Sequence, residues 1–317
     1  MIDFQYCMLR YIFKSYGTAH FYDINIPNKR KVNYESEDDV ARGNETSNVF
    51  KKSPRVLFEW FEGRITEKNL NNRFVLDLGS GFGGRTIYCA RAGKTKLCFG
   101  LDIDTRGVEE SKKYADFIKQ DNVFFAMGKG ENLPFASDLF DFVLSSDVLE
   151  HVNNVEKVFS DVYRILKPGG RFCSVFPPYY SATGSHVKRT KFPWLNVFFS
   201  TEKIYEVLTK EYGDNYELWY HKGKVLRKGL NGTTLKEYLE YTANSRFIVE
   251  YQYFAPLLSK PTEIYKSINS TVKRELLRFI FRAAMFLPFL NEFMTHRIVF
   301  IFRKPFSQPS SKPKGDI

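Results

Sequence analysis

The sequence contains few cysteines and no long uninterrupted apolar segment. Its four cysteines are widely spaced and form no Cys-x-x-Cys pair, which disfavours both a disulfide scaffold and a zinc site. Charged residues interrupt every apolar stretch before it could cross a bilayer, so we expect no membrane-spanning helix. Arg10 and Lys14 interrupt the apolar start, and no small-residue cleavage site follows it, so we expect no signal peptide. These absences predict a cytoplasmic protein.

The composition is that of an ordered globular protein. Hydrophobic residues make up 43% of the 317 residues and aromatic residues 17%, which is enough to form a substantial core. The length fits one large domain, or a domain with a sizeable insertion.

The excess of positive charge is concentrated in the last part of the sequence. The net charge is +11 for the whole chain, +1 for residues 1–72, zero for 73–177 and +10 for 178–317. A solvated, lysine-rich surface would account for this distribution. An anionic partner would account for it equally well, whether a phosphorylated or carboxylated substrate, an acidic membrane or a nucleic acid. The charge alone leaves both explanations open.

The middle of the sequence alternates short apolar segments with helix-like ones. The apolar segments predict strands at 74–78, 97–102, 123–127, 140–144 and 172–176. Helical periodicity predicts helices between them at 84–92, 108–119 and 155–166. The pattern resumes with a helix at 233–243 and strands at 247–253 and 296–302. Because single helices between consecutive strands require right-handed crossovers, we expect an α/β fold, namely a doubly wound, mostly parallel seven-stranded sheet with helices on both faces.

Interruptions of this alternation divide the chain into five regions. A core at 73–177 follows a region that we interpret as an N-terminal helical cap, 1–72. Residues 178–232 are rich in aromatic and basic residues without alternation, so we interpret them as a substrate lid inserted after the fifth strand. The rest of the sheet follows at 233–304. Residues 305–317 contain proline, serine and lysine and are expected to form a mobile tail.

The sharpest local signal is the loop Asp77-Leu78-Gly79-Ser80-Gly81-Phe82-Gly83-Gly84, between the first strand and the first helix of the core. Glycines at 79 and 81 allow a tight turn and a close approach of the backbone to a ligand. The N–H groups at the start of the helix would then face an anionic or polar group. Gly79, Gly81 and Gly84 also satisfy the fingerprint of dinucleotide-binding proteins. Asp102, at the end of the second strand, could accept ribose hydroxyls from either kind of cofactor.

Further blocks distinguish the two cofactor classes. Asp77 places a carboxylate where it would repel the pyrophosphate of a dinucleotide and attract the ammonium group of an amino acid. The later blocks are Gly128-Lys129-Gly130-Glu131-Asn132-Leu133-Pro134-Phe135, the segment 140–152, and Leu166-Lys167-Pro168-Gly169-Gly170. In this order and at these spacings, the set resembles the class I S-adenosylmethionine-dependent methyltransferases, specifically the type 11 branch that includes quinone-biosynthesis O-methyltransferases. The resemblance covers 73–177 closely and implies S-adenosyl-L-methionine as the cofactor, with an NAD-dependent oxidoreductase as the fallback.

The resemblance implies a cofactor site formed by Asp77, Gly79, Ser80, Gly81, Gly83, Asp102, Ile103, Lys129, Gly130 and Ser146. Asp77 and the glycines that follow it would hold the methionine end, Asp102 would take the ribose hydroxyls, and Ile103 would pack on the adenine. Gly130 would offer its backbone to the adenine edge, and the end of the fourth strand would line the sulfonium. Lys129 stands where the family often has an acidic residue. Because lysine cannot accept a hydrogen bond, we expect the backbone to make this contact.

The proton acceptor is the least defined part of the predicted site. Methyl transfer to a hydroxyl or amine requires alignment of donor and acceptor and removal of a proton. Asp147, His151 and His186 are the candidate catalytic residues, although an ordinary loop histidine is the favoured interpretation of His151, and His186 could equally be an ordinary lid residue. Asp147, Glu150 and His151 are also similar to an E-x-x-E-H metal cluster of some quinone O-methyltransferases. The aspartate at the first position departs from that cluster, and we predict no metal.

An amphipathic helical insertion is expected at 258–294. Apolar residues recur there at near-helical spacing from 263 to 293, with lysines and arginines between them. Packing against the sheet would account for this pattern. A basic amphipathic helix can also lie in a membrane interface, so peripheral membrane contact through 263–293 is the second explanation.

The pattern as a whole predicts a small-molecule methyltransferase. We expect O-methylation of an anionic or lipid-linked acceptor, such as a glycan or quinone precursor, because positive charge and aromatic residues accumulate after the core. The alternatives are a nucleic-acid methyltransferase and a cofactor-binding protein without activity. Residues 176–179 read Phe-Pro-Pro-Tyr, not the Asn/Asp-Pro-Pro-Tyr/Phe motif of nucleic-acid enzymes, which makes a nucleic acid the less favoured partner. The sequence leaves the oligomeric state open.

Overall fold

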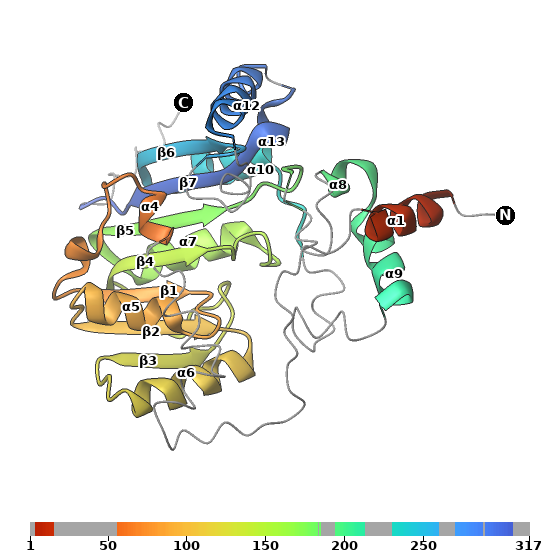
Figure 1. The fold of residues 1–317 in the computed structure, drawn as a ribbon. Coiled ribbons are helices and arrows are strands. Elements are labelled where there is room, and N and C mark those ends of the chain that lie inside the picture. The colour runs from red at the N-terminus through yellow and green to blue at the C-terminus, as the bar shows by residue number, and fades with distance from the viewer. Residues whose placement is uncertain are drawn as a thin grey trace, which may run out of the picture.

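The computed structural model describes residues 4–15, 56–182, 184, 194–212, 230–259, 270–287 and 289–306. Within them lies a seven-stranded sheet of order β3-β2-β1-β4-β5-β7-β6 (Figure 1). The strands are β1 (Phe74–Leu78), β2 (Leu97–Asp102), β3 (Val123–Met127), β4 (Phe140–Ser146), β5 (Leu166–Phe176), β6 (Ile248–Pro256) and β7 (Thr295–Arg303). The first five pair in parallel, and β7 runs antiparallel to both of its neighbours. The predicted doubly wound, mostly parallel sheet is therefore confirmed.

Helices cover both faces of the sheet. One hydrophobic core joins the sheet to α5 (Gly84–Ala92) and α6 (Thr105–Phe117), and a second joins it to α7 (Val155–Ile165) and α10 (Leu235–Asn244). Adjacent residues of β1 alternate between the two, since Val75 belongs to the first core and Leu76 to the second. Because parallel strands end at the same edge of a sheet, the loops after β1, β2, β3 and β4 lie along one edge, and these loops carry most of the predicted site residues.

Aromatic rings fill much of the second core. Phe172 of β5 stacks on Phe302 of β7 with ring centroids 5.7 Å apart, and Phe159 of α7 meets Phe172 edge to face at 5.6 Å. Tyr238 of α10 is fully buried beside them, and its hydroxyl lies 2.9 Å from Ser174 Oγ. These aromatic contacts help to hold α7 and α10 on the sheet.

The N-terminal helices lie in two places. α4 (Val56–Glu59) and the 3₁₀ helix η1 (Glu67–Leu70) pack into the first core directly before β1. α1 (Phe4–Ser15) packs instead against α9 (Thr201–Tyr212), where a small separate core contains Leu9, Leu195, Phe199, Ile204, Val207 and Leu208. Arg10 Nε also pairs with Glu211 Oε1 at 2.9 Å. Helix α1 of the predicted N-terminal cap and the described helices of the predicted lid therefore form one cluster.

From here on, the word cap means this cluster of α1 with α8 (Leu195–Phe198) and α9, and not the whole predicted region 1–72. Figure 1 shows the cap beyond the edge at which the parallel strands end. Asn196 Nδ2 donates to the carbonyl of Tyr179 at 3.0 Å, which ties the cap to the chain leaving β5. Much of the predicted lid at 178–232 and most of the predicted tail at 305–317 lie outside the described residues.

The predicted insertion before the last strand contains α12 (Thr271–Ala284) and α13 (Asn291–Met294). α12 lies against the edge strand β6 and has no buried residue, so packing against the sheet is confined to one side of the helix. None of the helices in the described ranges combines the length and the apolar character needed to cross a membrane.

Candidate functional site

The ends of β1, β2 and β3 are joined by backbone hydrogen bonds at the carboxyl edge of the sheet. The carbonyl of Leu101 accepts from the N–H groups of Gly79 at 2.8 Å and Ser80 at 3.1 Å. The carbonyl of Asp102 accepts from the N–H of Gly128 at 2.9 Å. The glycine loop, the end of β2 and the segment after β3, which were predicted from separate motifs, are therefore neighbours.

The glycine loop leaves open space beside Gly81. Gly79 and Gly81 both have positive φ angles, +70° and +52°, which favour glycine. A side chain at Gly79 would overlap Val148, which follows β4, whereas a Cβ at Gly81 would meet no atom within 4 Å. The Ser80 hydroxyl between them is buried and finds no hydrogen-bond partner in the described part of the chain. An open backbone beside an unsatisfied hydroxyl suits a loop that binds a polar ligand.

Asp77 is paired within the protein. Its fully buried carboxylate accepts from Arg85 Nε at 2.6 Å and from Thr86 Oγ1 at 2.7 Å, both on the first turn of α5. Burial lowers the pKa of Arg85, but attraction to Asp77 and its hydrogen bond outweigh burial, so the pKa of Arg85 is raised. Arg85 Nη2 also donates to the carbonyl of Gly79 at 3.1 Å.

The motif analysis overlooked Arg85. The signal was present, because a carboxylate buried inside a strand requires a cationic or hydrogen-bonding partner. The first basic residue after Asp77 is Arg85, in the first turn of the helix that the glycine loop opens. Its side chain keeps 16% of its surface exposed, so it is accessible from the loop.

Asp102 keeps hydrogen-bonding capacity after its protein contacts are made. Its Oδ2 accepts from the N–H of Gly81 at 2.7 Å and its Oδ1 from the N–H of Asp104 at 2.9 Å. Each carboxylate oxygen has two lone pairs, so each can accept one more bond, for instance from a ribose hydroxyl. Ile103 next to it is 50% exposed and Met127 at the end of β3 is 62% exposed, which provides apolar surface near the carboxylate.

The remaining cofactor candidates differ in exposure. Lys129 is exposed, whereas Gly130 is buried, and a Cβ at Gly130 would be in ordinary contact with Leu78 and Val158. Gly83 has a φ of +70°, and a side chain there would overlap Ser111 of α6, so this glycine is required by the packing of the loop.

An ion pair fixes the end of β4. Asp147 has a φ of +56°, its N–H donates to the carbonyl of Val175 at 2.9 Å, and its Oδ1 lies 2.7 Å from Arg297 Nη1 of β7. Ser146 Oγ donates to Asp147 Oδ2 at 3.3 Å. Arg297 was not among the predicted site residues, because only the fold brings β7 next to β5.

His151 and Glu150 lie in the turn after β4. The N–H of His151 donates to the carbonyl of Val148 at 2.9 Å, and its side chain is half-buried. Glu150 is buried, and burial followed by the nearby charge of Asp147 raises the pKa of its carboxyl group well above the usual value. No group of three potential metal ligands converges among the described residues, so Asp147, Glu150 and His151 do not form a ligand set. His186 lies outside the described residues.

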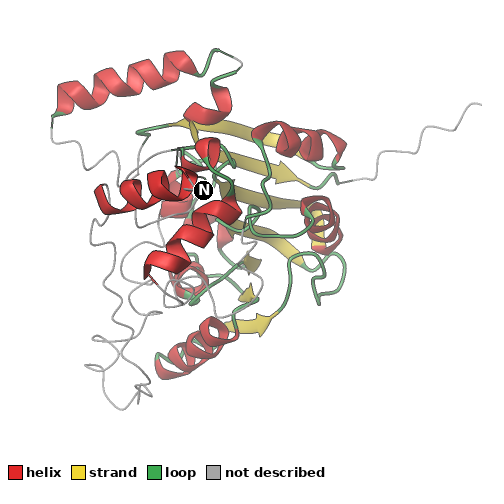
Figure 2. Cartoon of the chain, turned by 90° about the vertical axis from the view of Figure 1, so that its right-hand side faces the viewer, coloured by secondary structure: helices red, strands yellow, loops and turns green. Residues whose placement is uncertain are grey.

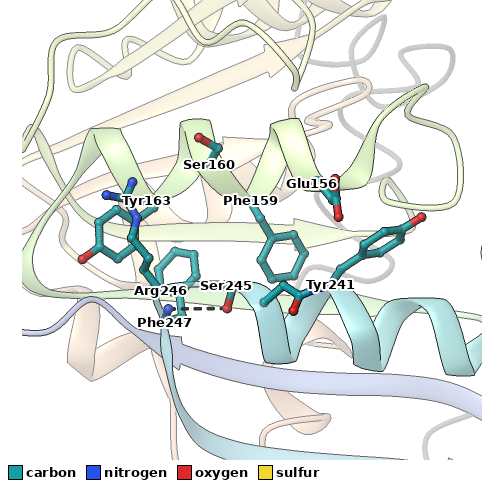
Figure 3. Close-up of a pocket in the computed structure, with 9 residues that line it drawn as sticks. Glu156, Phe159, Ser160, Tyr163, Tyr241, Ser245, Arg246 and Phe247 are labelled. Atoms are coloured by element: carbon teal, nitrogen blue, oxygen red, sulfur yellow. Dashed lines mark hydrogen bonds between the residues drawn. The ribbon is translucent and has the colours of Figure 1, made fainter. Parts of the chain in front are cut away.

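A separate depression of about 410 Å³ lies between α7 and α10 (Figure 3). Its lining consists of Glu156, Phe159, Ser160, Tyr163, Tyr241, Asn244, Ser245, Arg246 and Phe247. The Arg246 guanidinium lies 4.2 Å from the ring centroid of Tyr163, which closes one end of the depression. None of the predicted site residues lines it, so it is not the site formed at the carboxyl edge.

Comparison with known proteins finds a family that is similar to this chain over the glycine loop and the strands around it. Residues 76–174 match the family described as a methyltransferase domain. A solved S-adenosylmethionine-dependent methyltransferase from Mesorhizobium loti has the same fold, with a TM-score of 0.51 at 16% identity, over 80% of this chain and 99% of that one.

Two curated relatives match over shorter stretches. The chain is 32% identical over 118 residues to a phthiotriol/phenolphthiotriol dimycocerosates methyltransferase of Mycobacterium tuberculosis, which covers 37% of this chain and 43% of that protein. It is 26% identical over 141 residues to a fatty-acid O-methyltransferase of Mycolicibacterium smegmatis, which covers 44% of this chain and 50% of that protein. The chain thus spans about half the length, or less, of these two relatives.

Proposed function

We propose that this chain, which carries a class I, S-adenosylmethionine-dependent methyltransferase domain at residues 76–174, transfers a methyl group to a small acceptor. The observation that carries the proposal is the juxtaposition of the open loop at Gly81 with the Asp102 carboxylate, joined by a 2.7 Å hydrogen bond. When bound, S-adenosylmethionine would supply a methyl group on a positively charged sulfur; an electron pair of the acceptor would bond to the methyl carbon as the carbon–sulfur bond breaks, with S-adenosylhomocysteine as the leaving group.

The residues present fit this cofactor. The open backbone at Gly81 and the unsatisfied Ser80 hydroxyl suit the methionine end, which carries both an ammonium and a carboxylate group. Arg85 lies beside them and can attract the carboxylate, while the buried charge of Asp77 keeps this region electrically balanced. Asp102 has one free acceptor position on each oxygen for the ribose, and Ile103 offers an exposed apolar side chain for the adenine ring.

The acceptor would enter between the end of β4 and the cap. Oxygen as the attacking atom, and an anionic or lipid-linked acceptor such as a glycan or quinone precursor, are supported by two observations. One is the net charge of +10 over residues 178–317. The other is the similarity to a fatty-acid O-methyltransferase, which by its name methylates an oxygen of a lipid.

His151 is the favoured proton acceptor at this site. Asp147 is the carboxylate directly after β4, but the ion pair with Arg297 at 2.7 Å stabilises its negative charge and weakens it as a base. His151 is half-buried in the turn that follows β4, and an imidazole nitrogen can accept a proton from a hydroxyl or amine. An acceptor that arrives already ionised, such as a carboxylate, needs no base at all, so a carboxylic acid should be methylated by His151→Ala as fast as by the unaltered protein.

Calorimetric titration with S-adenosylhomocysteine and with NADH tests the cofactor. We expect binding of the former alone. Asp102→Asn removes the charge that strengthens two ribose bonds while keeping an acceptor for Gly81, so we expect affinity to fall by about tenfold to a hundredfold. Asp121→Asn, at an exposed position at the start of β3, is the matched control and should bind normally. Equal binding by all three proteins would contradict the assignment of Asp102.

A product assay tests the acceptor. The protein is incubated with S-adenosylmethionine labelled in the methyl group, and with either a free fatty acid, a polyprenyl-linked sugar, a quinone precursor or single-stranded RNA. We expect label in one of the first three. Transfer to RNA alone would replace the proposed acceptor class with nucleic acid, and binding of S-adenosylhomocysteine without transfer to any acceptor in a cell extract would indicate a protein that binds the cofactor without activity.

A further inference from the structure

α12 occupies an outer position on the molecule. It lies beside β6, the edge strand of the sheet. Figure 2 shows it as a long helix at the top of the view, set apart from the sheet. Its 14 residues include none that is buried. A helix of this length is about 21 Å long, which is too short to span a bilayer.

The apolar side of α12 faces away from the protein. Val272, Leu276, Phe279 and Ile280 follow the helical spacing i, i+4, i+7, i+8 and are 80%, 57%, 71% and 47% exposed. The stripe continues past the end of the helix in Phe286, which is 88% exposed. This arrangement is the reverse of that in an ordinary surface helix, whose apolar stripe faces the core.

The side of α12 that approaches the sheet combines arginines with apolar residues. The partly buried positions along it are Arg274, Leu277, Arg278, Phe281 and Ala284. Arg278 pairs with Glu275 at 2.7 Å within the helix itself. The inner side of α12 therefore holds two arginines and three apolar residues, and the more exposed apolar stripe is directed outward.

Charged residues border the exposed stripe. At 3.6 residues per turn, Lys273 lies on one side of it, and Glu275 and Arg282 lie on the other; all three are exposed. The Arg282 side chain also hydrogen-bonds to Tyr253 of β6. The helix contains four basic residues and one acidic residue, so it has a net charge of +3. An exposed apolar stripe on a helix of net positive charge matches the anionic headgroups and the acyl region of a membrane surface.

We propose that α12 and the turn that follows it dock the protein onto an anionic bilayer surface, with the helix lying in the plane of the membrane. A second copy of the chain is a poorer occupant, because two helices of net charge +3, on chains of net charge +11, would repel each other. Phosphatidylserine-type headgroups carry the complementary charge, and phenylalanine side chains partition into the interface below them.

The docking helix is connected to the cap. Trp194 Nε1, directly before α8, donates to the carbonyl of Phe293 in α13 at 2.8 Å. The N–H of Tyr180, in the segment leaving β5, donates to Glu292 Oε1 at 3.2 Å. α12 leads into α13 through residues 285–290, so docking of α12 would hold the cap side of the molecule near the membrane. This inference stands independently of the proposed methyl transfer, but it would bring a lipid-linked acceptor to the site.

Flotation of the full chain with phosphatidylcholine vesicles, with or without phosphatidylserine, tests the proposal. We expect flotation only with vesicles that contain phosphatidylserine. Phe279→Ser and Phe286→Ser should each weaken partitioning by about tenfold, because each removes an aromatic side chain from the proposed contact. Phe306→Ser is the matched control, since Phe306 is 75% exposed but lies outside α12, and it should float like the unaltered protein. Lys273→Glu should weaken partitioning, and Lys236→Glu on α10 should not.

Two results would overturn the proposal. One is that the unaltered protein does not float with phosphatidylserine vesicles. The other is that Phe279→Ser leaves flotation unchanged but converts a dimer to a monomer in light scattering, which would assign the stripe to a second copy. Binding of S-adenosylhomocysteine by the same variants separates this proposal from the proposed activity, because it should be retained whether or not α12 binds a membrane.

Discussion

Replacing Gly81 and Gly79 separately by alanine distinguishes a glycine kept for a ligand from a glycine kept for packing. Both residues have positive φ angles, so alanine at either position should cost about 1–2 kcal/mol of folding free energy. At Gly79 the new methyl group also overlaps Val148, which adds about 1–3 kcal/mol of overpacking. At Gly81 the methyl group enters open space and adds no such cost.

The two variants should therefore differ in what they lose. In urea denaturation we expect Gly81→Ala to unfold at moderately lower urea than the unaltered protein, and Gly79→Ala to unfold at lower urea still. In calorimetry, Gly81→Ala should bind S-adenosylhomocysteine about tenfold more weakly or worse, because its methyl group occupies the space beside the Asp102 carboxylate. If Gly81→Ala binds the ligand as well as the unaltered protein, the open space is not the cofactor site, and the central step of the proposed function fails.

Further predictions concern the groups around the sheet. His296 is fully buried, and burial, then the charge of Arg297, lowers its pKa to about 3, so stability should fall as pH drops below the ordinary histidine value of about 6.5. The loss from this residue should reach about 2 kcal/mol at pH 5 and vanish in His296→Gln, and equal pH profiles of the two proteins in urea unfolding would refute it. Tyr238→Phe removes the buried bond to Ser174 and should cost about 1–2 kcal/mol, whereas Tyr241→Phe, at a partly buried position of the same helix, should cost less. Arg85→Met leaves the Asp77 carboxylate buried without its cation and should cost about 3–5 kcal/mol in thermal unfolding, while Lys112→Met on the surface of α6 should have little effect.

Local features of the fold were predictable from the sequence, and the predicted bounds of the helices and strands were nearly right. The strands at 74–78, 97–102 and 123–127 and the helix at 84–92 agree with the structure, because glycines and caps mark their ends. The fifth strand was predicted too short. In the structure β5 begins at Leu166, which pairs with Phe140, and a register shift follows. The Lys167-Pro168-Gly169-Gly170 segment, which was expected to separate the helix from the strand, lies within β5.

Contacts between distant segments were not predictable in the same way. The pairing of Asp147 with Arg297 depends on β7 inserting antiparallel between β5 and β6, and nothing near either residue in the sequence indicates it. The core shared by α1 and α9 joins residues about 200 positions apart, and the two segments were therefore assigned to separate regions. For α12, the periodicity showed an apolar stripe but not its direction, because spacing along a helix defines its faces and not which of them meets the protein.

The ion pair between Asp77 and Arg85 changes the argument about the cofactor. From the sequence, the Asp77 carboxylate disfavoured a dinucleotide because it would repel a pyrophosphate. In the structure, the Arg85 guanidinium lies against that carboxylate and also contacts the Gly79 carbonyl, so the loop presents a balanced pair and not a lone negative charge. The repulsion is therefore much weaker than the sequence suggested. A balanced pair favours a ligand that itself carries both charges, as the methionine end of S-adenosylmethionine does. The choice between the two cofactor classes thus depends on this pairing of charges and on the match of residues 76–174 to the methyltransferase domain family, and no longer on Asp77 alone.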